Sequence, residues 1–211
     1  WGMLVAAPMA VIAIVMVAHP SVPANNAGEL IAYLKKNPDK LSFGSSGTGG
    51  ITHLAAELFK ARAGVSMTHV PYKGAAPALT DLMAGQINVF WDAMITANPH
   101  IKSGKIKALG MANAKRWDGA PEIPTIAESG LPGYEVSGWY GVLAPAGTPN
   151  DVLQRLNNDS VETIKELAFA AELQRQGLIP MGGSVDNYRK IVAADSAMWA
   201  NVIKSANIKI D

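Results

Sequence analysis

Residues 41–54 have the sequence LSFGSSGTGGITHL (Leu41 to Leu54), and this stretch decides the fold. It predicts a short strand over 41–44, a turn rich in glycine and hydroxyl residues, and a helix that runs to about Ala63. Such a turn points several backbone N–H groups at one spot, where the helix N-terminus adds roughly half a positive charge. The stretch therefore predicts a cradle that binds an anion without a cationic side chain.

This cradle differs from the common nucleotide-binding loops. Gly44 and Gly49 have the glycine spacing of a P-loop, but Gly50 stands where that motif needs lysine, and Thr52 stands where a dinucleotide fingerprint needs glycine. A small carboxylate therefore suits the cradle better than a phosphate chain. The alternative interpretation is a tight strand-to-helix turn that only needs glycine. The residues expected to bind the anion are Ser45, Ser46, Gly47, Thr48, Gly49, Gly50 and Thr52.

Strands and helices alternate on both sides of the cradle. Asn26 and Glu29 have the spacing of a capping box, which predicts a helix start, and Gly64 is placed to end the helix after the cradle. Further strands are expected over 65–70, 87–91 and 106–111, and further helices over 75–84 and 95–102. The alternation predicts an α/β fold whose mostly parallel sheet is covered by helices on both faces.

The two ends of the chain depart from this pattern. Met3 to Ala18 is almost entirely apolar. It is shorter than the ~20 residues of a membrane-spanning helix, and no Lys or Arg precedes it as in a signal peptide. We therefore expect one or two buried strands there. A long strand is expected over 134–143, followed by helices over 149–166, 168–176 and 184–206, whose sheet would come from the apolar N-terminal segment or from residues outside this chain.

Composition narrows the classes of function. Charged residues make up 17% of the chain and the formal net charge is +1, so no basic patch favours nucleic-acid binding. The chain has no cysteine, which excludes disulfide and thiolate chemistry. His19, His69 and His100 lack metal-ligand spacing, so we expect structural or surface roles for them and no metal site.

Two further candidates follow strands of the predicted sheet. Tyr72 comes after the strand 65–70, and Asp92 after the strand 87–91. Ligands of open α/β sheets bind at the carboxyl ends of parallel strands, so Tyr72 and Asp92 are expected to converge on the cradle. Tyr72 would otherwise lie on an exposed turn, and Asp92 would otherwise cap the helix that follows it.

His53 allows two interpretations. As a general base it would activate Ser45 or Ser46, which makes the chain a serine hydrolase. The Gly-x-Ser-x-Gly elbow of such enzymes is absent, because Gly47 follows Ser46 directly. We therefore favour a histidine that braces the loop by packing or hydrogen bonding.

Several stretches in order carry a family resemblance. They are HPSVPA (19–24), KLSFGSSGTGG (40–50), HVPYKGAAPALTDL (69–82), PTIAESGLPGYEV (124–136) and LAPAGTP (143–149). In this order they resemble the Bug receptors, the extracytoplasmic solute-binding proteins of tripartite tricarboxylate transporters (TctC family).

The resemblance implies a periplasmic protein with a type II periplasmic-binding-protein fold of two domains, the Venus flytrap. Such receptors are not enzymes, carry no cofactor, and deliver a small organic acid from the interdomain cleft to the membrane components of a transporter. In the family the loop that matches Ser45–Gly50 holds a ligand carboxylate, and the loops that match Tyr72 and Asp92 lie at the same cleft. We expect a monomer, with no signal peptide in this chain.

Two departures from the family pattern affect the expectations. Roughly the N-terminal third of a typical receptor has no counterpart here, so we expect one complete α/β domain over 20–137. The segments 1–19 and 138–211 would then be the core strand and the crossover strand with C-terminal helices of a second, partial domain. The family also commonly has Ser or Thr where Gly50 stands, which removes one hydroxyl donor from the cradle.

Overall fold

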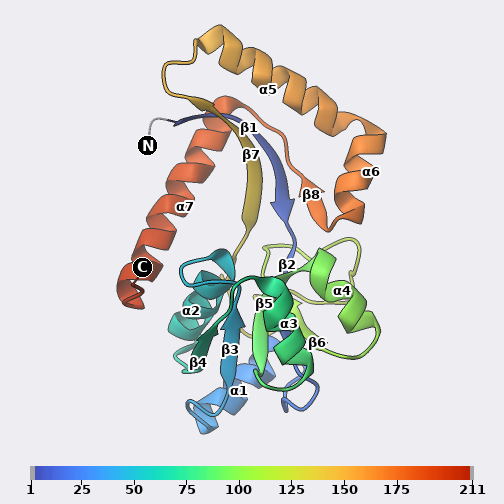
Figure 1. Cartoon of the computed structure of the whole chain (residues 1–211), viewed down its shortest axis with the longest axis vertical. Coiled ribbons are helices and arrows are strands. Elements are labelled where there is room, and N and C mark those ends of the chain that lie inside the picture. Colours follow the sequence, from blue (N-terminus) through green and yellow to red (C-terminus); the bar gives the residue numbers. More distant parts are fainter. Residues whose placement is uncertain (1–2, 210–211) are drawn as a thin grey trace. The chain divides into compact units, whose positions relative to one another are not determined.

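The computed structural model of the chain describes residues 3–209 (Figure 1). Its contacts divide these residues into two compact units. Unit 1 comprises residues 3–12 and 138–200, and unit 2 comprises residues 13–137 and 201–209. Each unit is built around its own sheet, and we describe the two units separately.

Unit 2 contains a five-stranded sheet in the order β4-β3-β5-β2-β6. The strands are β2 (Ile14–Ala18), β3 (Ser42–Ser45), β4 (Thr68–Pro71), β5 (Val89–Ala93) and β6 (Lys107–Met111). Strand β3 pairs in parallel with β4 and β5, whereas β2 is antiparallel to both β5 and β6. The expected mostly parallel sheet is thus found, with one antiparallel strand inserted near its centre. All five residues of β2 are buried, as expected of a strand whose sheet is covered on both faces.

Helices cover both faces of this sheet. They are α1 (Ala27–Lys36), α2 (Ile51–Ala63), α3 (Ala75–Met83) and α4 (Met94–Lys102). Successive residues of a strand point to opposite faces. Phe90 of β5 accordingly packs in one hydrophobic cluster with Leu79 and Leu82 of α3. Its neighbour Trp91 has its ring centroid 5.4 Å from that of Phe59 in α2, on the other face.

Local signals place the ends of two helices as predicted. Asn26 is the N-cap of α1, and its side chain accepts a hydrogen bond from the Glu29 N–H at 2.9 Å. Glu29 in turn accepts a hydrogen bond from the Asn25 N–H. Gly64 ends α2 with φ at 62°, in the left-handed region that glycine adopts without strain.

Unit 1 contains a three-stranded antiparallel sheet in the order β7-β1-β8. Its elements are β1 (Met3–Ile12), β7 (Gly138–Pro145), β8 (Leu178–Pro180), α5 (Asn150–Lys165), α6 (Leu167–Arg175) and α7 (Val185–Ser205), of which the last five residues of α7 fall in unit 2. Leu153 of α5 packs against Ala6 of β1 and Ala144 of β7. The C-terminal helices therefore have a sheet to cover, supplied in part by the apolar N-terminal segment.

That apolar segment forms two strands, β1 and β2, as the sequence analysis expected. The predicted domain limit at residue 19 differs from the contact division, which falls between Ile12 and Ala13. The physical reason is that β2 hydrogen-bonds to β5 and β6, so residues 14–18 pack within unit 2. Among the helices of residues 3–209, none has both the length and the apolar character that a bilayer span requires.

The end of β3 is packed too tightly for a side chain at position 44. A Cβ on Gly44 would lie 2.5 Å from Cδ1 of Ile87, which is itself 1% exposed. Gly44→Ala is therefore expected to lower the free energy of unfolding by about 1–3 kcal/mol through overpacking. Ile87→Val, which removes the clashing methyl group, should cost about 0.5–1.5 kcal/mol alone. In urea denaturation, the double variant should lose less free energy of unfolding than the two single variants lose in sum. A loss equal to that sum would contradict the contact between position 44 and Ile87.

Candidate functional site

The cradle lies at the carboxyl end of β3, between the ends of two parallel neighbours. Ser45 pairs with Pro71 at the end of β4, and Gly44 pairs with Phe90 of β5. Tyr72 follows the first of these partners and Asp92 lies two positions after the second. The topology therefore brings the ends of all three predicted strands to one edge of the unit 2 sheet, as the parallel arrangement required.

The segment after β4 holds the beginning of the loop by backbone hydrogen bonds. The Tyr72 N–H donates to the Ser45 carbonyl oxygen at 3.0 Å, and the Gly74 N–H donates to the Ser46 carbonyl oxygen at 3.1 Å. These bonds continue the hydrogen bonding between the two segments beyond the last paired residues of β3 and β4. Both carbonyl groups at the start of the cradle are therefore occupied.

The first turn of α2 holds the loop from the other side. The Ser46 N–H donates to Thr52 Oγ1 at 2.9 Å, and the Ser46 hydroxyl lies 3.0 Å from the same atom. The Gly49 N–H donates to Nδ1 of His53 at 3.1 Å. Gly49 has φ at 78°, which glycine adopts readily. Three of the predicted anion contacts, Ser46, Gly49 and Thr52, thus have groups committed to holding the loop.

Four backbone donors of the cradle remain available. Within residues 3–209, the N–H groups of Gly47, Thr48, Ile51 and Thr52 have no hydrogen-bond partner. The Gly50 N–H donates to the Gly47 carbonyl oxygen. Ile51 and Thr52 begin α2, and the first N–H groups of any helix lack partners within it. Unpaired donors at the positive end of a helix dipole favour a bound anion.

Ile51 is a residue that the sequence analysis missed. Its N–H is the first of the helix, and the signal for it was available once the helix start was placed after Gly50. The sequence analysis selected glycine and hydroxyl residues, and the apolar side chain of Ile51 excluded it. Gly50 itself is the N-cap residue, and no side chain caps this helix end.

His69 has a structural role, as the sequence analysis allowed, but its contact with the cradle was not predicted. Its Nε2 lies 2.7 Å from the Ser45 hydroxyl, directly below the cradle. Its ring stacks on that of His53, with centroids 3.8 Å apart and planes at 9°. Burial, and then the charges of His53 and Lys60, lower the pKa of His69 from 6.5 to about 4. Burial also lowers the pKa of His53, against the opposing effect of Glu57.

The histidine contacts decide between the two interpretations of His53. Ser45 is fully buried and its hydroxyl contacts His69, while the Ser46 hydroxyl contacts Thr52. The alternative interpretation, in which either serine pairs with His53, is therefore wrong. His53 instead accepts the Gly49 N–H, which is the bracing role that we favoured.

Tyr72 has its hydroxyl engaged within unit 2. Tyr72 Oη donates to Oδ2 of Asp81 at 2.7 Å. Burial and this hydrogen bond raise the pKa of Tyr72 to about 12. A phenol held in this way stays protonated at neutral pH. Contact of Tyr72 with a ligand stays a prediction.

Asp92 is a buried carboxylate at the end of β5. It is 3% exposed, and its Oδ2 accepts a hydrogen bond from the Thr96 hydroxyl at 2.6 Å. Ala93 is the N-cap of α4, so Asp92 is not the cap residue that the alternative interpretation expected, and it contacts the first helical turn through Thr96. Burial raises the pKa of Asp92, while the Thr96 hydrogen bond opposes this shift. A ligand contact of Asp92 also stays a prediction.

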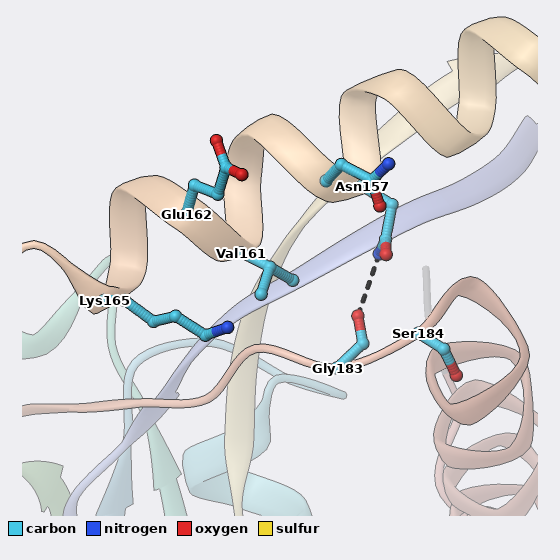
Figure 2. Close-up of a pocket in the computed structure, with 7 residues that line it drawn as sticks. Asn157, Val161, Glu162, Lys165, Gly183 and Ser184 are labelled. Carbon is cyan, nitrogen blue, oxygen red and sulfur yellow. Dashed lines mark hydrogen bonds between the residues drawn. The ribbon is translucent and has the colours of Figure 1, made fainter.

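Unit 1 has a separate hollow that contains none of the predicted site residues. Figure 2 shows it between α5 and the segment that precedes α7, with a volume of ≈ 440 Å³. Asn157 closes one side, since its Nδ2 donates to the Gly183 carbonyl oxygen at 2.9 Å. Asn157 also donates to the carbonyl oxygen of Ala6, which explains its burial. No group of three or more potential metal ligands occurs within the described residues of either unit.

The raised pKa of Asp92 gives a test of its role. Because its folded-state pKa is raised, ionisation of Asp92 above that pKa lowers stability, and Asn in its place keeps an acceptor for Thr96 without the buried charge. Asp92→Asn should therefore leave the melting temperature at pH 7 unchanged or raise it. The advantage over the wild type should shrink as the pH falls toward 3.8.

Thr96→Val is the matched control for this substitution. It removes the hydroxyl that stabilises the ionised carboxylate, so it should lower the melting temperature at pH 7. A large loss of stability in Asp92→Asn would contradict the electrostatic account of this site.

This chain is similar to known proteins in both sequence and fold. A family model described as the tripartite tricarboxylate transporter family receptor, TctC, matches residues 3–208. BugT of Bordetella pertussis is 32% identical over 93% of this chain and 60% of its own length. An R. palustris protein solved with adipate is 35% identical, with a TM-score of 0.86 over 98% of this chain and 69% of that chain. MatC from Rhodopseudomonas palustris, solved with bound malate, is 26% identical, with a TM-score of 0.81 over 95% of this chain and 69% of that chain.

The matched solved structures cover nearly the whole of this chain but only about 70% of their own chains. The chain spans 52% of the length of a Pseudomonas relative and 60% of the length of BugT. The periplasmic-binding-protein α/β fold expected from the sequence is confirmed by the solved structures.

Proposed function

The chain belongs to the tripartite tricarboxylate transporter receptor family, and we propose that it is a solute-binding receptor whose cradle captures a carboxylate group of a small organic acid. One observation carries the proposal. Four N–H groups at the start of α2 and in the preceding loop have no partner within residues 3–209, and no lysine or arginine shares the loop. A carboxylate has four lone-pair directions and one negative charge, which suits these donors.

The two solved relatives indicate the class of ligand. One was solved with adipate and the other with malate, and both acids are dicarboxylates. We infer that this chain also binds a small dicarboxylate, with one carboxylate at Gly47, Thr48, Ile51 and Thr52. Ser45, Ser46, Gly49 and Gly50 then shape the loop more than they contact the ligand, while Tyr72 and Asp92 adjust selectivity.

The wider role follows from the family. We propose that the receptor works in the periplasm as a monomer, without cofactor or catalysis, and passes its ligand to the membrane components of a tripartite transporter. The deeply buried Ser45 and the braced His53 support binding over hydrolysis, since neither offers an accessible nucleophile or base.

Paired ligands test whether the carboxylate is what the cradle binds. The melting temperature of the chain would be measured with adipate, malate and their diamides up to about 10 mM, which detects dissociation constants near 1 mM. At ~100 times its dissociation constant a bound acid adds about 2.7 kcal/mol of stability. The acids should raise the melting temperature and the neutral diamides should not. No shift with either acid, or equal shifts with acid and diamide, would overturn the proposal.

Ile51→Pro tests one backbone donor of the cradle, the N–H of residue 51. Proline lacks an N–H but is tolerated at the first helical position, and Gly50 before it already has φ at −74° and ψ at 167°, which suits a residue before proline. The substitution should weaken acid binding about tenfold or more, because hydrogen bonds to charged groups contribute ~1.5–3 kcal/mol. Isothermal titration would measure this loss.

Ile51→Ala is the matched control, because it removes the same side chain but keeps the N–H. It should bind the acid within about threefold of the wild type, since the backbone donor is intact. Equal affinities of the Pro and Ala variants would exclude Ile51 from the site.

A further inference from the structure

Two histidines from different elements meet below the cradle. His53 lies in the first turn of α2 and His69 in β4, and their rings stack almost in parallel at 3.8 Å. Phe43 of β3 continues the stack, with its ring centroid 4.9 Å from that of His69. Each histidine also touches the loop, through Gly49 and Ser45 respectively. The pair thus connects three elements of unit 2 to both ends of the cradle.

The contact with Gly49 fixes the protonation state of His53. A backbone N–H only donates, so Nδ1 of His53 accepts and carries no proton. The single proton of the neutral ring is then on Nε2, which faces Oε1 of Glu57 at 3.8 Å. An imidazolium carries protons on both nitrogens and has no acceptor for Gly49. Protonation of His53 and the Gly49 hydrogen bond are therefore mutually exclusive.

The surroundings oppose a charge on either ring. His53 faces Glu57, Lys60 and His69, and His69 faces His53 and Lys60. Lys60 is paired with Glu57 at 2.8 Å and lies over the Phe43 ring, with Nζ 5.2 Å from the centroid. The one nearby carboxylate is thus shared with a lysine. A proton on one ring repels both Lys60 and any proton on the other ring.

We propose that His53 and His69 are positioning residues that form a proton-sensitive latch, which holds the cradle in its binding shape only while both rings are neutral. The inference rests on the proposed carboxylate site. Protonation of His53 removes the acceptor of the Gly49 N–H, and protonation of His69 places a positive charge against His53 and Lys60. In either case the loop releases the donors that surround the ligand.

The direction of the pH effect follows from proton linkage. The pKa of His69 lies near 4 in the closed latch against 6.5 for an ordinary histidine. The open loop therefore binds more protons than the closed loop in this window, so falling pH favours the open loop. If ligand binding needs the closed loop, the affinity for the acid should be highest above pH 6.5 and should fall progressively as the pH falls toward 4.

Substitutions that keep the hydrogen bonds but cannot titrate test this latch. Asn places Oδ1 where Nδ1 of His53 lies, and Gln places Oε1 near Nε2 of His69. Adipate or malate, whichever binds the wild type more tightly, would be titrated at pH 7.5 and pH 5 into the wild type, His53→Asn, His69→Gln and the double variant. Comparison of proteins at the same pH cancels the titration of the ligand itself.

At pH 7.5 the Asn and Gln variants should bind within about threefold of the wild type, whereas His53→Leu, which leaves Gly49 unpaired, should lose about tenfold. At pH 5 the double variant should bind about tenfold more tightly than the wild type, because only the wild type has a latch to protonate. His53→Leu that equals His53→Asn at pH 7.5, or a wild type that follows the double variant at both pH values, would overturn the latch.

The design separates failure of the latch from failure of the proposed function. If the wild type binds neither acid at pH 7.5, the carboxylate site itself is wrong and the latch falls with it. If the wild type binds at pH 7.5 and the variants show no pH difference from it, the carboxylate site stands and only the latch is refuted. Far-ultraviolet circular dichroism at pH 5 would confirm that each protein compared is folded.

Discussion

The parallel pairing of β3 with β4 and β5 is the constraint on which the site depends. It places Ser45 opposite Pro71 and Phe43 opposite His69, so the loop after β3 and the residues after β4 leave the sheet side by side. A slip of one residue would turn His69 to the opposite face, because successive side chains of a strand alternate. The stack of Phe43 and His69 and the bond from Ser45 to His69 would both be lost. The cradle is therefore a product of strand register as much as of glycine.

Features that depend on neighbouring residues were predictable from the sequence. The cap at Asn26, the left-handed end of α2 at Gly64 and the strand-loop-helix form of 41–54 each follow from residues within one turn of each other. The apolar segment near the N-terminus was also assigned correctly to strands, since length and flanking residues excluded the other interpretations. The convergence of the three strand ends followed from their being parallel neighbours, which the strand-helix alternation indicated.

Features that depend on distant residues were not predictable. Nothing in the residues of β2 gives its direction, because a strand buried on both sides has the same apolar pattern whether it runs parallel or antiparallel. His69 offered no signal, since its meeting with His53 depends on the register of β4 against β3. The contact of the Ser45 hydroxyl with His69 was not predicted for the same reason, because it depends on the pairing of β3 with β4.

An anion site without a cation has consequences for selectivity. Backbone N–H groups are fixed by the loop and the helix, so the cradle is arranged before any ligand arrives, and binding does not have to order a long side chain. Under the proposed function these donors contact only a carboxylate group of the ligand, and every organic acid in the class has one. Under the proposed function, discrimination among acids therefore falls to groups that meet the rest of the ligand. Tyr72 with Asp81, and Asp92 with Thr96, are already held in place by hydrogen bonds of 2.7 Å and 2.6 Å at the same edge of the sheet. Under the proposed function, substitutions around the cradle would change the preferred acid without altering the cradle or its two histidines.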